Sequence, residues 1–206
     1  MTPPRNPDLS PQTIVAFLAD IFERRGGEEY LGEPVTMAEH MLQGAHMAEQ
    51  RGENEEIVVA TLLHDIGHFT SEFGTFSMDD THDKYHEEEG ARVLERFFPR
   101  IVTDCVRYHV AAKRYICATD PNYLDQLSVA SLHSLKLQGG PMSAAEVAEF
   151  EKRPNVREIV KVRYLDDAGK VAGMVTPGFA HYAPMVQRVV DAFCTASAPG
   201  AAGGRS

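Results

Sequence analysis

The chain has no tryptophan, and its three cysteines are too few and too scattered to form a structural framework. Cys105, Cys117 and Cys194 are odd in number and widely spaced. This pattern argues against a set of disulfides and against a cysteine-rich zinc site. We therefore expect the three thiols to act as small apolar side chains in the interior.

Basic clusters and long apolar segments are also missing. The chain has 20 basic and 30 acidic residues, a formal charge of −10, and no lysine and arginine cluster that could follow a phosphate backbone. No apolar segment approaches the length that crosses a bilayer, and residues 1–11 are polar and proline-rich, unlike an export signal. We therefore expect no nucleic-acid partner, no membrane partner and a cytoplasmic location. The sequence leaves the oligomeric state open.

Alternation of polar and apolar residues, which marks a half-buried strand, is nearly absent. Helical signals recur instead, beginning with Ser10-Pro11, apolar residues at helical spacing and a stop at Gly26-Gly27. Further helices are predicted at about residues 36–51, 54–66, 83–98, 99–113, 122–137, 143–151, 156–167 and 181–194. The predicted fold class is all-α, with at most one short strand near residues 169–175.

The length and composition suit a single domain. A chain of 206 residues with 43% hydrophobic residues can bury one core, and we place that domain at residues 1–194. Residues 195–206 are small and glycine-rich and lack large apolar side chains. Such a segment cannot offset the entropy lost on ordering, so it is predicted to be a disordered tail.

What the chain does contain is a set of histidines and aspartates inside the predicted helices. The candidates are His40, the adjacent pair His64 and Asp65, His86, His109 and Asp166. Imidazole and carboxylate groups hold first-row transition metals, and this set is too large for one tetrahedral ion. The sequence therefore predicts two metal ions that share a bridging ligand.

The His64-Asp65 pair is the strongest local signal. It ends an apolar helix beside Gly67, where the helix can break and direct both side chains inward. On its own, such a pair is more often a buried histidine with a hydrogen-bonded neighbour than a metal ligand. The pair gains weight only from the other candidates.

Some assignments stay open on spacing alone. His82 competes with His86 because both could lie on one helical face, and Asp167 competes with Asp166. The remaining histidines are interpreted as surface or core residues: His46, His133 and His181.

The pattern of a lone histidine, a His-Asp pair and a distant aspartate resembles the HD-domain superfamily, matched here by His40, His64-Asp65 and Asp166. The resemblance implies a helical bundle in which these four residues hold one metal. It also implies that Asp65, His86 and His109 hold a second metal with open positions for substrate. The same alignment favours His86 over His82 and Asp166 over Asp167.

A narrower resemblance is to the organophosphonate oxygenases of this superfamily, which are similar to myo-inositol oxygenase. It rests on residues 30–33, 39–40, 63–68, 109–115, 137–142 and 166–170, above all on His-Val-Ala-Ala-Lys-Arg-Tyr at 109–115 and Gln-Gly-Gly-Pro at 138–141. The resemblance implies two iron ions, mixed-valent Fe(II)/Fe(III), that use O2 to cleave the carbon–phosphorus bond of a 1-hydroxyalkylphosphonate. The alternatives are a metal-dependent phosphohydrolase acting on a nucleotide or phosphodiester, and a noncatalytic HD-type binding domain.

Residues near the predicted ligands suit a bound anion. His68 and Lys113 each lie four positions after a predicted ligand, so each shares a helix face with that ligand. Ser131, Ser134 and Gln138 fall at i, i+3 and i+7, a single stripe of hydrogen-bond donors. We expect these five side chains to bind the phosphonate.

Two further expectations concern the entrance and the amine. The phenol of Tyr30 can ligate ferric iron, and with Glu33 it could form a flap that substrate displaces. Aromatic and acidic residues in 69–83 favour a quaternary ammonium, which cannot donate a conventional N–H hydrogen bond. The preferred substrate is therefore (R)-1-hydroxy-2-(trimethylammonio)ethylphosphonate, giving glycine betaine and phosphate. The 2-amino analogue, giving glycine and phosphate, is a close second.

Overall fold

The fold is seen in a computed structural model that describes residues 9–30, 32–70 and 85–197. Within these ranges every regular element is helical, and the only bridge between extended residues pairs Glu29 with Thr36. The all-α prediction is confirmed. The elements are α1 (Ile14–Arg25), α2 (Met37–Gln50), α3 (Glu55–Leu63), α4 (Gly67–Thr70), α5 (His86–Leu94), α6 (Arg100–Thr119), the 3-10 turn η1 (Leu124–Gln126), α7 (Val129–Leu137), α8 (Ala144–Phe150), α9 (Val156–Ala168) and α10 (Phe179–Ala196).

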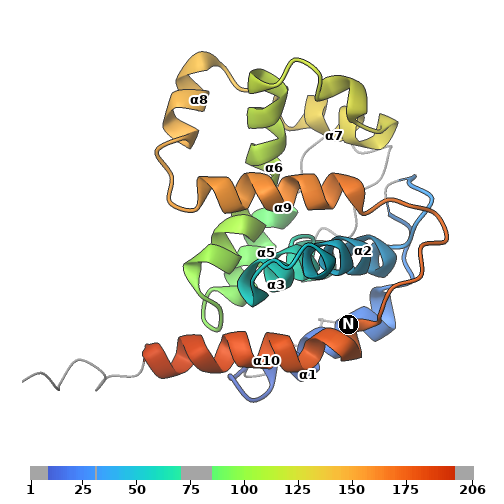
Figure 1. The fold of residues 1–206 in the computed structure, drawn as a ribbon, viewed down its shortest axis with the longest axis vertical. Coiled ribbons are helices and arrows are strands. Elements are labelled where there is room, and N and C mark those ends of the chain that lie inside the picture. Colours follow the sequence, from blue (N-terminus) through green and yellow to red (C-terminus); the bar gives the residue numbers. More distant parts are fainter. Residues whose placement is uncertain (1–8, 31, 71–84, 198–206) are drawn as a thin grey trace, which may run out of the picture.

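The helices lie in stacked layers (Figure 1). Helices α1 and α10 pack together along one side, α2 and α3 form the next layer, and α9 crosses over that layer. Helix α6 packs against α3, α5 and α9, while α7 and α8 lie at the end away from α1 and α10. The larger of two apolar clusters in the described residues runs from α1 through α3 and α6 to α10. The centre of this bundle is where all the predicted ligands meet.

Capping residues fix where several helices begin. Thr36 and Glu39 form a capping box at the start of α2, and the side chain of Asn54 accepts the backbone N–H of Ile57 at the start of α3. Ser128 caps α7 in the same way, by accepting the backbone N–H of Ser131. Because Ser128 starts a new helix, the single helix predicted at 122–137 is wrong, and η1 and α7 replace it.

Other predicted boundaries also shift. The helix predicted at 54–66 ends at Leu63, and residues 64–66 form a turn before α4 begins at Gly67. Helix α6 continues six residues beyond the predicted end at Lys113 because its buried face extends to Cys117. The helix predicted at 181–194 begins at Phe179 and runs to Ala196, two residues into the predicted tail. Residues 198–206 lie outside the described part, so the disordered tail stays a prediction.

The short strand considered near residues 169–175 is absent from that described segment. The backbone of Val171 pairs instead with the side-chain amide of Gln43 on α2, so no strand partner is needed.

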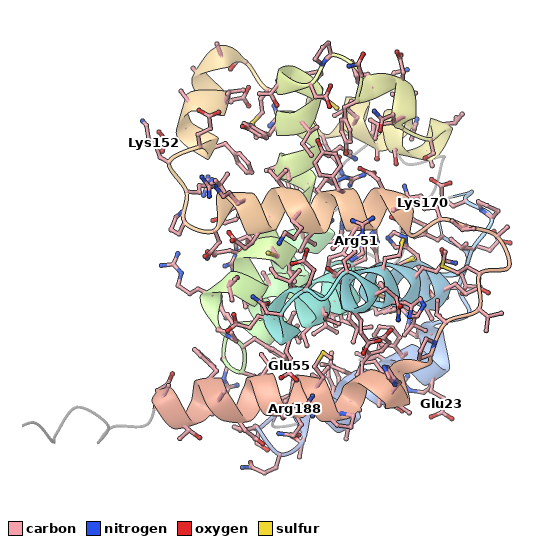
Figure 2. All side chains as sticks on the ribbon, viewed as in Figure 1. Glu23, Arg51, Glu55, Lys152, Lys170 and Arg188 are labelled. Carbon is pink, nitrogen blue, oxygen red and sulfur yellow. The ribbon has the colours of Figure 1, made fainter. Side chains whose placement is uncertain are left out.

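Elsewhere in the bundle, Arg188 of α10 is ion-paired with Glu55 of α3, and both are labelled in Figure 2. None of the described helices is both long and apolar enough to span a membrane.

Candidate metal centre and anion pocket

Five elements bring the predicted ligands together at the centre of the bundle. His40 lies on α2, His86 begins α5, His109 lies on α6 and Asp166 lies on α9, while the His64-Asp65 pair occupies the turn after α3. All six side chains are buried. Burying imidazole and carboxylate groups costs free energy unless they are paired or coordinate a metal. Helix formation alone therefore does not explain why six such side chains lie in the core.

Asp65 lies between two histidine pairs. Its Oδ2 is 3.5 Å from Nε2 of both His40 and His64. Its Oδ1 is 3.2 Å from Nε2 of His86 and 3.3 Å from Nε2 of His109. Each carboxylate oxygen thus faces a different pair, which is the arrangement of a carboxylate that bridges two ions. The first cluster comprises His40, His64, Asp65 and Asp166, and the second cluster comprises Asp65, His86 and His109.

Asp166 completes the first cluster. Its Oδ1 is 3.3 Å from Nε2 of His40 and 3.7 Å from Nε2 of His64. This oxygen is buried and has no hydrogen-bond partner among the described residues. Its neighbour Asp167 instead accepts hydrogen bonds from Arg163 and Tyr123, away from the histidines. The two adjacent aspartates therefore have different surroundings, and only Asp166 joins the cluster.

Outer hydrogen bonds orient the imidazoles. Nδ1 of His40 lies 2.9 Å from the carbonyl of Gly169, Nδ1 of His64 lies 2.8 Å from that of Thr61, and Nδ1 of His109 lies 2.8 Å from that of Val106. A carbonyl only accepts, so each Nδ1 carries the proton and each Nε2 presents a lone pair. This is the tautomer of a histidine that binds a metal through Nε2.

The orientation of these rings fits a cation better than a hydrogen bond. Nε2 of His40 lies 3.0 Å from Nε2 of His64, and Nε2 of His86 lies 3.1 Å from Nε2 of His109. In the first pair both nitrogens present lone pairs, which repel each other unless a proton or a cation lies between them. With an unpartnered Asp166 oxygen beside them, the donor set suits a divalent or trivalent ion at each cluster.

The protonation equilibria point the same way. Burial disfavours an imidazolium, but the carboxylates of Asp65 and Asp166 raise the pKa of His64 to about 9. Burial raises the pKa of both carboxyls, yet His64 and Arg163 outweigh it, and the pKa values of Asp65 and Asp166 fall well below the usual range. Both carboxylates therefore stay ionised, and a metal ion can take the place of the proton on His64.

Two glycines allow the elements to approach closely enough. A Cβ on Gly67 would lie 1.8 Å from the carbonyl oxygen of His86, so only glycine lets α4 touch the start of α5. A Cβ on Gly169 would lie 2.8 Å from the carbonyl oxygen of His40. The close approach at Gly67 sets the distance between Asp65 and His86. The close approach at Gly169 places its carbonyl beside Nδ1 of His40.

A polar pocket adjoins the second cluster. Its lining includes all seven residues that the sequence predicted for substrate contact or catalysis: Tyr30, Glu33, His68, Lys113, Ser131, Ser134 and Gln138. The buried Lys113 ammonium donates to Ser134 Oγ at 2.7 Å. Burial and the nearby Arg163 lower the pKa of Lys113 to about 7. Two buried atoms at the pocket have no hydrogen-bond partner among the described residues, His68 Nδ1 and Gln138 Oε1. We call this cavity the anion pocket.

Tyr30 and Glu33 close one side of the anion pocket. The Tyr30 ring stacks on His40 with centroids 4.0 Å apart. Burial and the charge of Asp65 raise the pKa of the Tyr30 phenol well above its usual value. Glu33 accepts a hydrogen bond from Ser128 at the start of α7. The turn that carries both residues is thus tied to α2 and α7, while its role as a displaceable flap stays a prediction.

Sequence reasoning missed two cationic residues of this site. Arg163 is buried on α9, and its Nη1 lies 2.7 Å from Asp166 Oδ2. Lys170 follows α9 and donates to Ser131 Oγ at 2.8 Å. The i, i+3 and i, i+4 spacing from Arg163 to Asp166 and Asp167 was a signal that could have found the arginine. No local spacing points to Lys170.

The candidates set aside lie elsewhere. His181 pairs with Glu49 at the surface of α10, and His46 and His133 do not line the anion pocket. His82 lies outside the described residues, as do the aromatic and acidic side chains of 71–83 on which the amine preference rested. The thiols of Cys105 and Cys117 are buried as expected, whereas Cys194 is only partly buried.

Comparison with known proteins fits this geometry. Residues 37–143, which carry His40, the His64-Asp65 pair, His86 and His109, match the model of the HD domain. The chain belongs to the HD-domain family.

Within that family its similarity to two phosphonate dioxygenases extends over most of its length. It is 70% identical over 191 residues to the glycine-betaine-forming 1-hydroxy-2-(trimethylamino)ethylphosphonate dioxygenase of Leisingera caerulea, covering 93% of this chain and 97% of that protein. It is 40% identical over 174 residues to the hydroxymethylphosphonate dioxygenase of Gimesia maris, covering 80% of this chain and 83% of that protein.

Proposed function

We propose that this protein is an oxygenase that cleaves the carbon–phosphorus bond of 1-hydroxy-2-(trimethylammonio)ethylphosphonate, using O2 and two iron ions, and releases glycine betaine and phosphate. The observation that carries the proposal is the 70% identity to a dioxygenase of that specificity over nearly the whole chain. The anion pocket beside two histidine clusters is the structural feature that supports it. The cytoplasmic location remains a prediction.

The residues that would hold the ions follow from the two clusters. The first cluster would hold one iron through His40, His64, Asp65 and Asp166, and the second would hold the other through Asp65, His86 and His109. When bound, a mixed-valent iron pair supplies redox chemistry with O2 that zinc or magnesium cannot. The second cluster has three protein ligands, which leaves coordination positions for a substrate.

The overall reaction balances with O2 alone. The hydroxyphosphonate contains four oxygen atoms, and glycine betaine plus phosphate contain six, so both atoms of O2 enter the products. The carbon–phosphorus bond breaks, and C1 passes from the alcohol to the carboxylate oxidation level while O2 is reduced. One proton is released as hydroxyphosphonate dianion becomes carboxylate and hydrogen phosphate.

The protein's own residues bind and orient the anion. Lys113 donates to Ser134 Oγ, and the Ser134 hydroxyl donates to the backbone carbonyl of Ser131. The remaining N–H groups of Lys113 and the hydroxyl of Ser131 can donate to phosphonate oxygens. His68 stacks on His86 at a centroid distance of 3.9 Å, which holds its ring between the second cluster and the pocket. Burial lowers the pKa of His68 well below its usual value, so the imidazole is neutral and can donate one hydrogen bond and accept another.

The test is aerobic and anaerobic incubation of iron-loaded protein with the trimethylammonio and amino substrates side by side. Phosphate and glycine betaine should appear only with O2, and the trimethylammonio substrate should have the higher kcat/KM. A His64→Ala variant that stays folded should lose metal and turnover.

Two outcomes would replace the proposal. Phosphate release without O2, with zinc or manganese sufficing, would identify a phosphohydrolase. Turnover that persists in His64→Ala would show that the reaction does not take place at these clusters.

A further inference from the structure

The two motifs at 109–115 and 138–141 each contain residues that lie outside the anion pocket. Lys113 of the first motif and Gln138 of the second line the pocket, whereas Arg114, Gly139 and Gly140 lie outside its lining. These outlying residues contact one another. A guanidinium nitrogen of Arg114 would be 3.6 Å from a Cβ placed on Gly139, which is an ordinary van der Waals distance. The two motifs therefore meet in the fold at a point beside the pocket.

Gly139 and Gly140 end α7 in a left-handed turn. Their φ angles are +95° and +72°, a region that glycine enters readily and other residues rarely adopt. The N–H of Gly139 donates to the carbonyl of Lys136 at 3.3 Å, and that of Gly140 donates to the carbonyl of Leu135 at 2.9 Å. This pair of bonds is a Schellman motif. Gln138 is the C-cap of α7, so its backbone belongs to the turn.

Arg114 fixes this turn from α6. Its Nε donates to the carbonyl oxygen of Gly140 at 2.8 Å, and its own backbone carbonyl accepts the N–H of Met142 at 3.1 Å. Its Nη2 donates to Glu146 Oε1 at 2.7 Å, and Glu146 forms the capping box with Ser143 that begins α8. Figure 1 shows α7 and α8 on either side of the end of α6. One arginine thus joins α6, the turn after α7 and the start of α8.

These contacts bear on the anion pocket through Gln138. Its Oε1 is buried and has no hydrogen-bond partner among the described residues. Gln138 lies about one helical turn after Ser134, which accepts a hydrogen bond from Lys113. A side-chain amide carries two donors and an acceptor, so a bound phosphonate can complete its hydrogen bonds. The turn therefore carries a polar group that a ligand in the pocket can use.

We propose that Arg114 is a positioning residue. By holding the turn at Gly139 and Gly140, it keeps the amide of Gln138 at the wall of the anion pocket, where that amide binds the phosphonate. The proposal rests on the proposed function, since it assumes a phosphonate in the pocket.

The bond from Arg114 to Gly140, rather than the ion pair with Glu146, should carry the effect. The Glu146 side chain is 45% exposed, and ion pairs at the surface contribute little. The bond to Gly140 is partly buried and joins a charged donor to the backbone of the turn itself. The planar fork of a guanidinium allows Arg114 to make both contacts at once.

The first experiment tests Arg114 against its ion pair. Iron-loaded Arg114→Met should raise KM for the trimethylammonio substrate about 3- to 10-fold, the range for one misplaced hydrogen bond, and kcat should change less. The dissociation constant of inorganic phosphate, measured by calorimetry on the anaerobic enzyme, should rise in parallel. Glu146→Gln breaks the ion pair but keeps a capping box, so it should change both constants less than about twofold. Arg24→Met, on an exposed ion pair of α1, is the control. An unchanged phosphate affinity in Arg114→Met would overturn the proposal.

The second experiment is a double-mutant cycle between Arg114 and Gln138. Gln138→Met removes the amide and should alone weaken phosphate binding at least as much as Arg114→Met does. Arg114→Met should then cost less than about twofold in the Gln138→Met background, because Arg114 acts through Gln138. Equal losses in both backgrounds would mean a general structural role for Arg114 and would overturn the positioning assignment.

The third experiment strains the turn without touching Arg114. Gly139→Ala and Gly52→Ala both place alanine at a positive φ, +95° and +71°, and neither added Cβ meets an atom closer than 3.6 Å. Both should lower Tm, since alanine is strained in this region. Only Gly139→Ala should raise the dissociation constant of phosphate, by about threefold or more. Equal phosphate affinities in the two alanine variants would overturn the proposal.

Two provisions keep the outcomes separate. If Arg114→Met fails to fold, Gly139→Ala takes its place in the double-mutant cycle with Gln138. If wild-type protein turns over no phosphonate, the proposed function has failed. If wild-type protein is active and Arg114→Met keeps the wild-type KM and phosphate affinity, only the positioning role of Arg114 is excluded.

Discussion

Arg163 places one guanidinium against two carboxylates inside the bundle. Its Nη1 contacts Asp166 Oδ2, which turns the other oxygen of Asp166 toward His40 and His64. Its Nε lies 3.0 Å from the Tyr123 hydroxyl, which in turn donates to Asp167. The acidic groups raise the pKa of Arg163 well above its usual value against the effect of burial, so the group is always charged.

Replacing Arg163 by methionine should therefore leave Asp166 free to rotate and leave the buried Asp166 and the partly buried Asp167 without their cation. We expect the free energy of unfolding to fall by roughly 3–5 kcal/mol, the usual cost of breaking a buried ion pair. The iron content should fall to about one per chain as the first cluster loses its geometry.

Denaturant unfolding and iron analysis measure both effects. Arg188→Met is the matched control, because Arg188 is exposed and its pair with Glu55 lies far from the clusters. Full iron content and unchanged unfolding in Arg163→Met would show that Asp166 holds its orientation without the guanidinium.

Lys113 gives the anion pocket a pH dependence with a defined sign. Burial and Arg163 lower its pKa to about 7, so the free enzyme loses this positive charge as the pH rises above that value. A bound phosphonate stabilises the ammonium, so binding above pH 7 requires uptake of a proton. We expect KM to be nearly constant below pH 7 and to rise above it.

The substrate also ionises in this pH range, which changes KM independently of Lys113. A comparison with Lys113→Arg corrects for this effect. The guanidinium stays charged at every accessible pH, so the ratio of the two KM values isolates the lysine. The wild-type KM should rise relative to that of Lys113→Arg between pH 7 and 9. Parallel pH profiles would mean that Lys113 does not titrate in this range.

At the scale of elements, the contact between α4 and α5 controls the second cluster. Asp65 lies just before α4 and His86 begins α5, so their separation depends on how closely these two helices pack. Gly67 and Gly90 meet at this contact, with backbone atoms where side chains would otherwise lie.

Gly67→Ala should push the two helices apart, because the added Cβ would overlap the His86 carbonyl oxygen. We expect a loss of stability of about 1–3 kcal/mol from overpacking and a selective loss of the second iron. Iron analysis and thermal unfolding provide the measurements. Gly27→Ala, which has no atom within 4 Å of the added Cβ, should change neither. Two irons per chain in Gly67→Ala would contradict this account of the contact.

For the whole molecule, loading of the clusters should be coupled to stability. The facing imidazole nitrogens, and the Asp166 oxygen that no described residue hydrogen-bonds, are costly to bury without a cation, so binding favours the folded state. A ligand present at 100 times its dissociation constant stabilises the folded state by about 2.7 kcal/mol.

Removing iron with a chelator under anaerobic conditions should therefore lower Tm by several degrees, and Fe(II) should restore it. Differential scanning calorimetry of the two forms measures the shift. The same experiment on His64→Ala should show a smaller shift, since the first cluster is already impaired. Equal Tm values for iron-loaded and iron-free wild type would argue that these residues do not bind the metal.

The sequence was sufficient to predict the helical class and most helices, because helical periodicity and caps are local. It missed the boundary at Ser128, which caps α7 and divides one predicted helix into two. A four-residue capping pattern could have suggested this boundary. We predicted that His40, Asp65 and Asp166 converge from the resemblance to a family, because their spacing in the sequence does not show it. Lys170 was missed because its position depends on Gln43, which is 127 positions earlier in the sequence and is brought near only by the fold.

Asp65 has one further consequence under the proposed assignment. A single carboxylate supplies an oxygen to each cluster, so occupancy on one side fixes the side chain and removes negative charge available to the other. The two ions are then not independent: titration with iron should give an uneven uptake curve, and replacing one ion by a foreign metal should alter the spectrum of its neighbour. Preparations with one iron per chain should consequently not contain the proportions of empty, half-filled and filled protein that two independent sites would give.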